Sequence, residues 1–328
     1  MRRREFLGVL GSGAAAAWSS GSLAQKTPIR VGLLGSGAAT SVITAAQVAT
    51  IKEGLRGYNL IDGRDYVLDA RFAAGHYERF PELARELAQA GAGVILTNTI
   101  ASVRAAQHLT PPVPIVMLAI NDPIGTGLIA SLAKPGNYTT GLATLNEDLT
   151  LKLLEFFRAI LPSAKSVAVL FNPSNPTNIK FVENLRMHAG AMGIVVHPAG
   201  LKSPDVLEAT FAELVAQKPD ALFVLSDSGV IDLSDRIAAL ALAHRLPTLS
   251  TSPTVAEFGG LLAYGAPRNK LFLRSAYFVK RIFDGANPGD VPVEQPTQIE
   301  LWINLKTAKT LALEMPLHLQ QLADKVIE

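Results

Sequence analysis

Largely apolar runs of strand length alternate along the chain with segments whose apolar residues recur every three or four positions. Residues 29–34, 94–96, 113–118 and 167–171 show the first pattern, whereas residues 42–55 and 77–90 show the second. Strands of a parallel sheet are buried on both faces, so they are apolar without alternation. The pattern therefore predicts an α/β fold with parallel sheets covered by helices.

The second half of the chain repeats this plan, which predicts two doubly wound parallel-sheet lobes with a boundary near residues 141–148. Helices are expected over 149–161, 178–192, 205–217, 233–244 and 271–283, with Ser203 or Asp205 capping the third. Strands are expected over 194–197, 221–225, 247–249, 261–264 and 299–303, followed by a helical stretch to Glu328. The segment 284–296, rich in proline and glycine, is expected to cross between the lobes.

Composition narrows the class of protein. The 328 residues are 48% hydrophobic and 18% charged, which excludes intrinsic disorder. The 30 basic and 28 acidic residues nearly cancel, which argues against a nucleic-acid binder. The absence of cysteine in the sequence excludes disulfides, thiolate metal sites and a lipid-modified cysteine.

The first 24 residues resemble an export signal. Three arginines, Arg2 to Arg4, precede Phe6-Leu7, a short apolar stretch and a small-x-small site that ends at Ala24. We expect cleavage there, with the twin-arginine route favoured over the general secretory route. Removal of residues 1–24 would leave 27 basic and 27 acidic residues. The mature chain is then expected in the periplasm without a lipid anchor.

Small polar residues gather where the predicted strands end. Ligands of open parallel sheets bind beyond the carboxyl ends of the strands, close to the free amides of helix N-termini. Capping of the following helix is the alternative role for each residue. The candidates are Ser36, Thr97, Asn98, Thr99, Asn121, Asp122, Asn172, Ser174, Asn175, Ser226, Asp227, Ser228, Thr251 and Ser252.

The sequence offers little for an enzyme. None of the six histidines has metal-ligand spacing, and neither a nucleophile elbow nor a Walker loop occurs. We therefore predict no catalytic residue, no metal and no cofactor.

Across residues 28–328 the chain resembles the substrate-binding protein family of ABC transporters that includes tryptophan and tyrosine importers. The matching segments run in order along the chain. They are residues 54–58 with 62–64, 81–87, 122–136, 171–176, 285–288, 303–309 and 323–324. The resemblance implies a type I periplasmic binding fold, in which two Rossmann-like lobes joined by three crossings close on a ligand.

Under this resemblance the expected domains are a signal at 1–24, an N-terminal lobe of 25–145 plus about 266–290, and a C-terminal lobe of 146–265 plus about 291–328. A cleft that closes on a zwitterion needs donors for a carboxylate and an acceptor for an ammonium group. Ser36 and residues 97–99 are the candidate donors, and Asp227 is the candidate acceptor. The family pattern usually has Asn after this Asp, but the chain has Ser228. Tyr264 and Phe258 are candidates for an aromatic wall.

The sequence thus predicts a periplasmic receptor of an ABC importer that binds a small molecule, an amino acid or a related carboxylate. The ligand-binding set is Ser36, Thr97, Asn98, Thr99, Asp122, Asn172, Asn175, Ser226, Asp227, Thr251 and Tyr264. The expected partner is an inner-membrane ABC permease, with no nucleic acid and a monomeric receptor. The alternatives are a sensor that reports to a membrane kinase and a secreted α/β enzyme.

Overall fold

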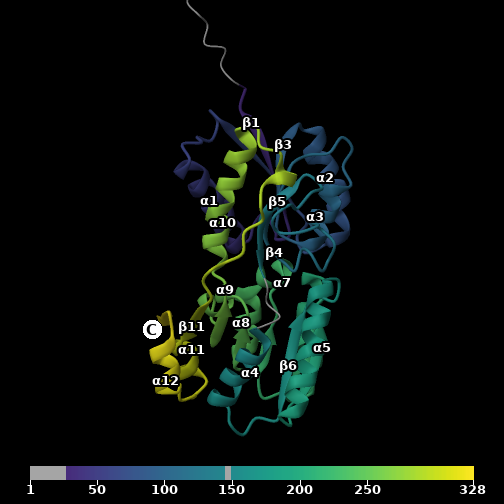
Figure 1. The fold of residues 1–328 in the computed structure, drawn as a ribbon. Coiled ribbons are helices and arrows are strands. Elements are labelled where there is room, and N and C mark those ends of the chain that lie inside the picture. Colours follow the sequence, from purple (N-terminus) through teal and green to yellow (C-terminus); the bar gives the residue numbers. More distant parts are fainter. Residues whose placement is uncertain (1–26, 145–148) are drawn as a thin grey trace, which may run out of the picture.

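The computed structural model describes residues 27–144 and 149–328, in two lobes joined along one long axis (Figure 1). The export signal expected at residues 1–24 lies outside the described residues. Within these residues, no helix combines the length and the apolar character needed to cross a bilayer.

The N-terminal lobe is built on a five-stranded parallel sheet in the order β2-β1-β3-β4-β5. Its strands are β1 (Ile29–Gly35), β2 (Tyr66–Phe72), β3 (Ala92–Thr97), β4 (Ile115–Asn121) and β5 (Thr139–Thr144). Its helices are α1 (Val42–Gly57), η1 (Tyr77–Arg79), α2 (Phe80–Gln89), α3 (Ile100–Gln107), α10 (Arg268–Phe283) and η3 (Pro288–Asp290). Helices α1 and α10 cover one face of the sheet, and α2 and α3 cover the other.

The C-terminal lobe is built on a seven-stranded sheet in the order β12-β11-β10-β9-β8-β6-β7. Its strands are β6 (Ser166–Phe171), β7 (Val195–Gly200), β8 (Leu222–Val224), β9 (Thr248–Ser250), β10 (Leu262–Gly265), β11 (Glu300–Asn304) and β12 (Lys325–Ile327). Its helices are α4 (Leu149–Ile160), α5 (Pro176–Ala191), η2 (Pro204–Val206), α6 (Leu207–Ala216), α7 (Ser228–Ile231), α8 (Ser234–Ala243), α9 (Pro253–Glu257), α11 (Leu305–Thr310) and α12 (Leu317–Leu322).

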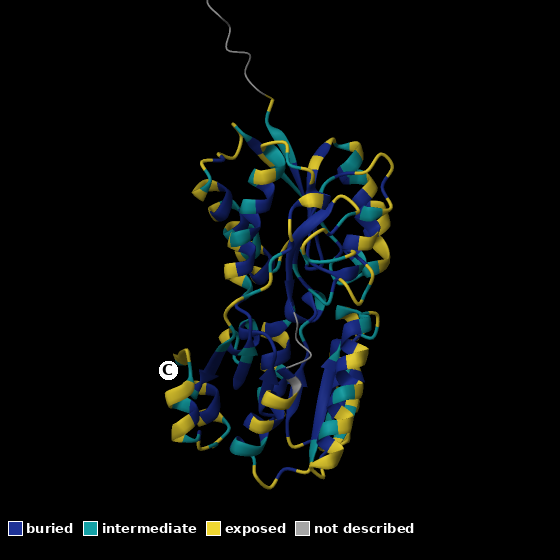
Figure 2. Ribbon diagram, viewed as in Figure 1, coloured by how far each residue is buried: buried dark blue, intermediate teal, exposed yellow. Residues whose placement is uncertain are grey.

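The sheets are buried on both faces, as the unbroken apolar strands predict. Val167 and Val169 point into a core shared with α4 and α5, whereas Ala168 and Leu170 point into a core shared with α6 and α8. Figure 2 shows these strands as buried and the outer surfaces of the helices as exposed. Each lobe thus has its own apolar core on both faces of its sheet, and the region between the lobes is left to polar contacts.

Helix α10 enters the N-terminal lobe from the C-terminal lobe. The chain leaves β10 at Gly265, runs through α10 against α1 and β4, and stays with the N-terminal lobe to Glu294, which pairs with Leu142. The return to β11 therefore falls after Glu294, near the end of the segment 284–296 expected to cross. The domain boundaries themselves stay a prediction.

Four details differ from the sequence-based expectation. Strand β11 runs antiparallel to β10, because the chain returns to the sheet after its excursion through α10. The end of the chain forms β12 rather than a helix, since residues 325–327 pair with β11. Neither Ser203 nor Asp205 caps α6, which follows a short 3₁₀ turn with no side-chain cap. The short helices α7 and α9 were not expected, because they are too brief to show apolar periodicity.

Candidate functional site

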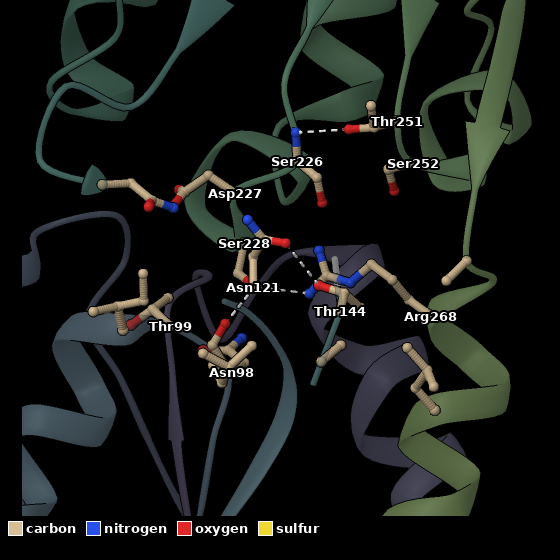
Figure 3. A pocket seen from close by; sticks show the side chains of 16 residues that line it. Asn98, Thr99, Asn121, Thr144, Ser226, Asp227, Ser228, Thr251, Ser252 and Arg268 are labelled. Atoms are coloured by element: carbon tan, nitrogen blue, oxygen red, sulfur yellow. Dashed lines mark hydrogen bonds between the residues drawn. The ribbon is translucent and has the colours of Figure 1, made fainter. Parts of the chain in front are cut away.

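The two lobes meet at the carboxyl ends of their parallel strands and enclose a cavity there (Figure 3). Its walls come from the ends of β3, β4 and β5 on one side and of β6, β8, β9 and β10 on the other. The lining residues are Asn98, Thr99, Ile100, Ala119, Ile120, Asn121, Thr144, Asn175, Ser226, Asp227, Ser228, Thr251, Ser252, Ala266, Arg268 and Leu271. The cavity has a volume of about 40 Å³, room for roughly three water molecules.

Short helix α7 of the C-terminal lobe carries many of the contacts between the lobes. Its N-cap, Asp227, is only 5% exposed and accepts a hydrogen bond from Gly229 N at 3.1 Å. The Tyr77 hydroxyl of the N-terminal lobe donates to Asp227 Oδ1 at 2.7 Å. Ser228 Oγ donates to the carbonyl oxygen of Asn98 at 2.6 Å. A four-residue helix thus touches the N-terminal lobe through its cap and its first residue.

A second buried carboxylate lies just beyond this helix. Asp232 accepts hydrogen bonds from Ser36 Oγ at 2.6 Å and from Gln47 Nε2 at 2.9 Å, both in the N-terminal lobe. Burial raises the pKa of the Asp232 carboxyl, although the Arg268 charge and these two donors oppose the shift. Burial, together with the nearby Asp227 charge, also raises the pKa of Tyr77 well above its usual value, so Tyr77 remains a hydrogen-bond donor.

Arg268 supplies the positive charge of the site. It is the first residue of α10, and its Nη2 donates to Ser228 Oγ at 2.9 Å. Burial lowers the pKa of the Arg268 guanidinium, whereas Asp232 and Asp227 raise it. A guanidinium nevertheless stays charged in proteins. The cavity is therefore lined by one cationic side chain and one carboxylate, Asp227.

The structure brings six of the eleven predicted ligand-binding residues to this cavity. They are Asn98, Thr99, Asn175, Ser226, Asp227 and Thr251. Thr99 also caps α3 through a reciprocal pair with Ser102, and Asn175 caps α5, so the alternative role of capping applies to both. Whether these residues bind a ligand stays a prediction.

The other five predicted residues do not line the cavity. Ser36 bonds Asp232 instead, and Thr97 is fully buried within the N-terminal lobe. Asp122 accepts from Gly125 N in its own turn, and Asn172 donates to Asp227 Oδ1 from behind the cavity wall. Tyr264 packs edge-to-face on Phe156, because its strand turns this side chain toward α4. Phe258, the other proposed aromatic wall, is the C-cap of α9 and is also absent from the lining.

Sequence reasoning missed Arg268, Tyr77 and Asp232. Arg268 follows the end of β10 by three residues, so the strand-end argument would have found it had basic side chains been included. Tyr77 and Asp232 carry no such signal, since their partners lie 150 and 196 positions away in the chain.

Comparisons with known proteins agree with this architecture. The model of a protein family described as "ABC transporter substrate binding protein" matches residues 43–327 of this chain. A tyrosine-binding protein of Clostridioides difficile is 26% identical over 260 residues, which cover 79% of this chain and 74% of that protein.

Two solved structures share the fold. A conserved domain protein from Vibrio cholerae has a TM-score of 0.80 at 23% identity, covering 91% of this chain and 99% of that one. An ABC domain from Streptococcus pneumonia in complex with L-Trp has a TM-score of 0.79 at 23% identity, covering 92% of this chain and 100% of that one. At this identity the likeness shows the fold, which is the two-lobed α/β arrangement of a type I periplasmic binding fold. On the match over most of its length, the chain belongs to the substrate-binding protein family of ABC transporters.

Proposed function

We propose that the protein is an extracytoplasmic receptor that captures an amino acid or a related small carboxylate and presents it to an ABC permease. One observation carries the proposal: Arg268 and Asp227 line the same cavity, which both lobes enclose. A cation and an anion at one site complement the carboxylate and the ammonium group of a zwitterion. The tyrosine and L-Trp named for two relatives support this class of ligand.

Closure of the lobes is the proposed signal to the permease. A ligand held by residues of both lobes binds the closed arrangement better than the open one, so it shifts the population toward closure. The contacts of Asp227 and Asp232 across the lobes support a closed arrangement that forms as a distinct state. The chain is proposed to bind its ligand without turning it over, to act as a monomer, and to leave the cytoplasm through the signal at residues 1–24.

Thermal-shift screening of the purified chain against amino acids, organic acids, sugars and nucleosides tests the proposal. A ligand at 100 times its Kd adds about 2.7 kcal/mol of stability, which corresponds to several degrees in Tm. A shift with an amino acid or carboxylate supports the receptor function, and a shift confined to sugars or nucleosides contradicts the proposed ligand class.

The variant Asp227→Asn then tests the ammonium contact, because it keeps an oxygen for the α7 cap but loses the charge. If Asp227 binds the ammonium group, the variant should weaken an amino acid more than the corresponding hydroxy acid. Equal weakening of both would assign Asp227 to closure alone.

A further inference from the structure

We infer that the cavity selects a small, non-aromatic carboxylate, with Arg268 as the anchor of the anion and the Ser252 hydroxyl as a second contact. The inference rests on the proposed receptor function and narrows its ligand class. It departs from the aromatic amino acids named for the relatives.

Arg268 has most of its hydrogen-bonding capacity unused. A guanidinium group carries five N–H donors, and in the described part of the chain Arg268 makes one hydrogen bond, to Ser228 Oγ. Its Cζ lies 5.2 Å from the centre of the Phe272 ring, which supports the group from one side. Arg268 also begins α10, where the helix dipole adds to the positive potential. A carboxylate fits the free edge of such a planar fork with two parallel hydrogen bonds.

Ser252 is the second observation that points to a ligand. Its side chain lines the cavity, the residue is only 1% exposed, and its Oγ has no hydrogen-bond partner among the described residues. Figure 3 shows the hydroxyl groups of Ser226 and Ser252 directed into the space above Arg268. A buried hydroxyl without a partner is unfavourable, so a ligand oxygen placed here removes a defect of the empty site.

The carboxylate of Asp227, by contrast, already has most of its hydrogen-bonding positions filled. Asp227 accepts hydrogen bonds from Tyr77, Asn172, Asn175 and Gly229. A carboxylate offers about four lone-pair positions, and these four donors use most of them. Among the described residues, only Oδ2, which accepts from Asn175 alone, keeps a position for an ammonium group, whereas most N–H donors of Arg268 still lack an acceptor.

The walls exclude an aromatic side chain on chemical grounds. Among the sixteen lining residues, all in the described part of the chain, none is aromatic, and the apolar ones are Ile100, Ala119, Ile120, Ala266 and Leu271. An aromatic side chain buries about 150–250 Å² and needs an apolar or aromatic surface against it. A mostly polar lining of this kind favours an aliphatic or hydroxylated acid.

Calorimetric titration of the purified chain tests the ligand class. The probes are L-serine, L-threonine, L-lactate and succinate, with L-tryptophan and L-tyrosine as the aromatic comparison. Serinamide, threoninamide and lactamide are the matched analogues, in which an uncharged amide replaces the carboxylate. We expect at least one small carboxylate to bind more tightly than both aromatic amino acids, and its amide to bind about 30-fold more weakly or worse, because a charged partner of Arg268 is removed.

Two variants test the anchor. Arg268→Gln should weaken the best carboxylate about 30-fold or more, whereas Arg281→Gln, on the exposed surface of the same helix, should leave it unchanged. Ser252→Ala should weaken binding about three- to tenfold while leaving the Tm of the free protein unchanged or higher, because the variant removes an unsatisfied hydroxyl. If Arg268→Gln fails to fold, the comparison of carboxylate with amide in the unaltered protein decides the role of the anion.

Three results would overturn the inference. Tighter binding of L-tryptophan or L-tyrosine than of every small carboxylate rejects the ligand class but leaves the receptor function standing. Equal affinity for a carboxylate and its amide, or equal effects of Arg268→Gln and Arg281→Gln, rejects the anchor alone. Absence of binding by every probe, aromatic and small, contradicts the receptor function and the inference together.

Discussion

The contact between the lobes has two sides that differ in how completely their polar groups are paired. Around Asp227 and Asp232, two buried carboxylates accept hydrogen bonds from the opposite lobe, from Tyr77 and from Ser36. We call this the latch side. Next to it lies the ligand side, where Arg268 donates one hydrogen bond and Ser252 Oγ has no hydrogen-bond partner among the described residues. Polar groups that are paired across the lobes fix the position of one lobe against the other, whereas unpaired groups are available to a bound ligand. The two sides should therefore respond differently to substitution.

The largest effect is expected at Gly265, which ends β10 and leads the chain to Arg268. A Cβ atom here would lie 1.9 Å from the carbonyl oxygen of Thr251, a backbone atom that cannot turn aside. We expect Gly265→Val to destabilise the protein by about 3 kcal/mol or more and to lower its Tm by several degrees. Gly57→Ala, with no atom within 4 Å of its added carbon, should change stability by less than about 1 kcal/mol in the stabilising direction. Equal Tm values for the two variants would contradict the close packing of Gly265 against Thr251, which positions the ligand side.

The next effect breaks the latch side. Tyr77→Phe removes a donor from Asp227 Oδ1 and an acceptor from Gly229 N, which costs about 1–3 kcal/mol in the closed arrangement. We expect every ligand to bind about 5- to 150-fold more weakly, with the ratios between ligands preserved, since Tyr77 does not line the cavity. The closed population, followed by small-angle scattering, should fall. Tyr138→Phe is the control, because this side chain is 49% exposed. A change in ligand preference for Tyr77→Phe would show that the two sides are not separate.

A smaller effect concerns pH. Because burial raises the pKa of Asp232, the folded protein holds a proton that the unfolded chain has already lost, so stability due to Asp232 falls as pH rises from about 4 through the raised pKa. Asp232→Asn keeps an oxygen for Ser36 and removes the titration. The Tm of the variant minus the Tm of the native protein should therefore increase as pH rises from 4 to 8. Asp235→Asn, at an exposed position, should track the native curve. Parallel curves for Asp232→Asn and the native protein would remove Asp232 as the source of the slope.

The smallest effect sharpens the distinction between buried and exposed contacts. Lys180 Nζ of α5 lies 3.9 Å from Asp122 Oδ2 of the N-terminal lobe, and the two side chains are 55% and 22% exposed. Lys180→Ala should change ligand affinity by less than about 1 kcal/mol, and 1 M salt should abolish the difference. A loss of ligand affinity as large as that of Tyr77→Phe would show that the exposed Lys180–Asp122 pair, and not Asp227, holds the lobes together.

The local signals in the sequence explain how far the fold was predictable. Runs such as residues 167–171 revealed the buried strands, because both faces of a parallel sheet are apolar. Helix α7 and strand β12 escaped notice, since four or three residues show no period. The antiparallel entry of β11 depends on the route of α10 through the other lobe, which no local pattern records.

The residues of the candidate site also fall into those with a local signal in the sequence and those without one. Ser226 and Thr251 could be anticipated because each follows a strand end, and all strand ends of a parallel sheet face one edge. Ser36 follows the same rule but lies against Asp232, because the closed arrangement puts that carboxylate in front of it. The roles of Tyr77 and Asp232 depend on the meeting of two lobes, so they are tertiary properties that one sequence does not express locally.

The route of α10 has a consequence for how the chain assembles. Gly54 of α1 sits so close to α10 that an added Cβ would lie 2.5 Å from the carbonyl oxygen of Leu273. This partner is made only after most of the C-terminal lobe, so during synthesis α1 and β4 wait with an apolar face uncovered. Contacts of such long sequence separation slow folding. A fragment that ends at residue 144 should therefore be prone to aggregation, because the N-terminal lobe, although first in the chain, is complete only once α10 and the segment to Glu294 have been made.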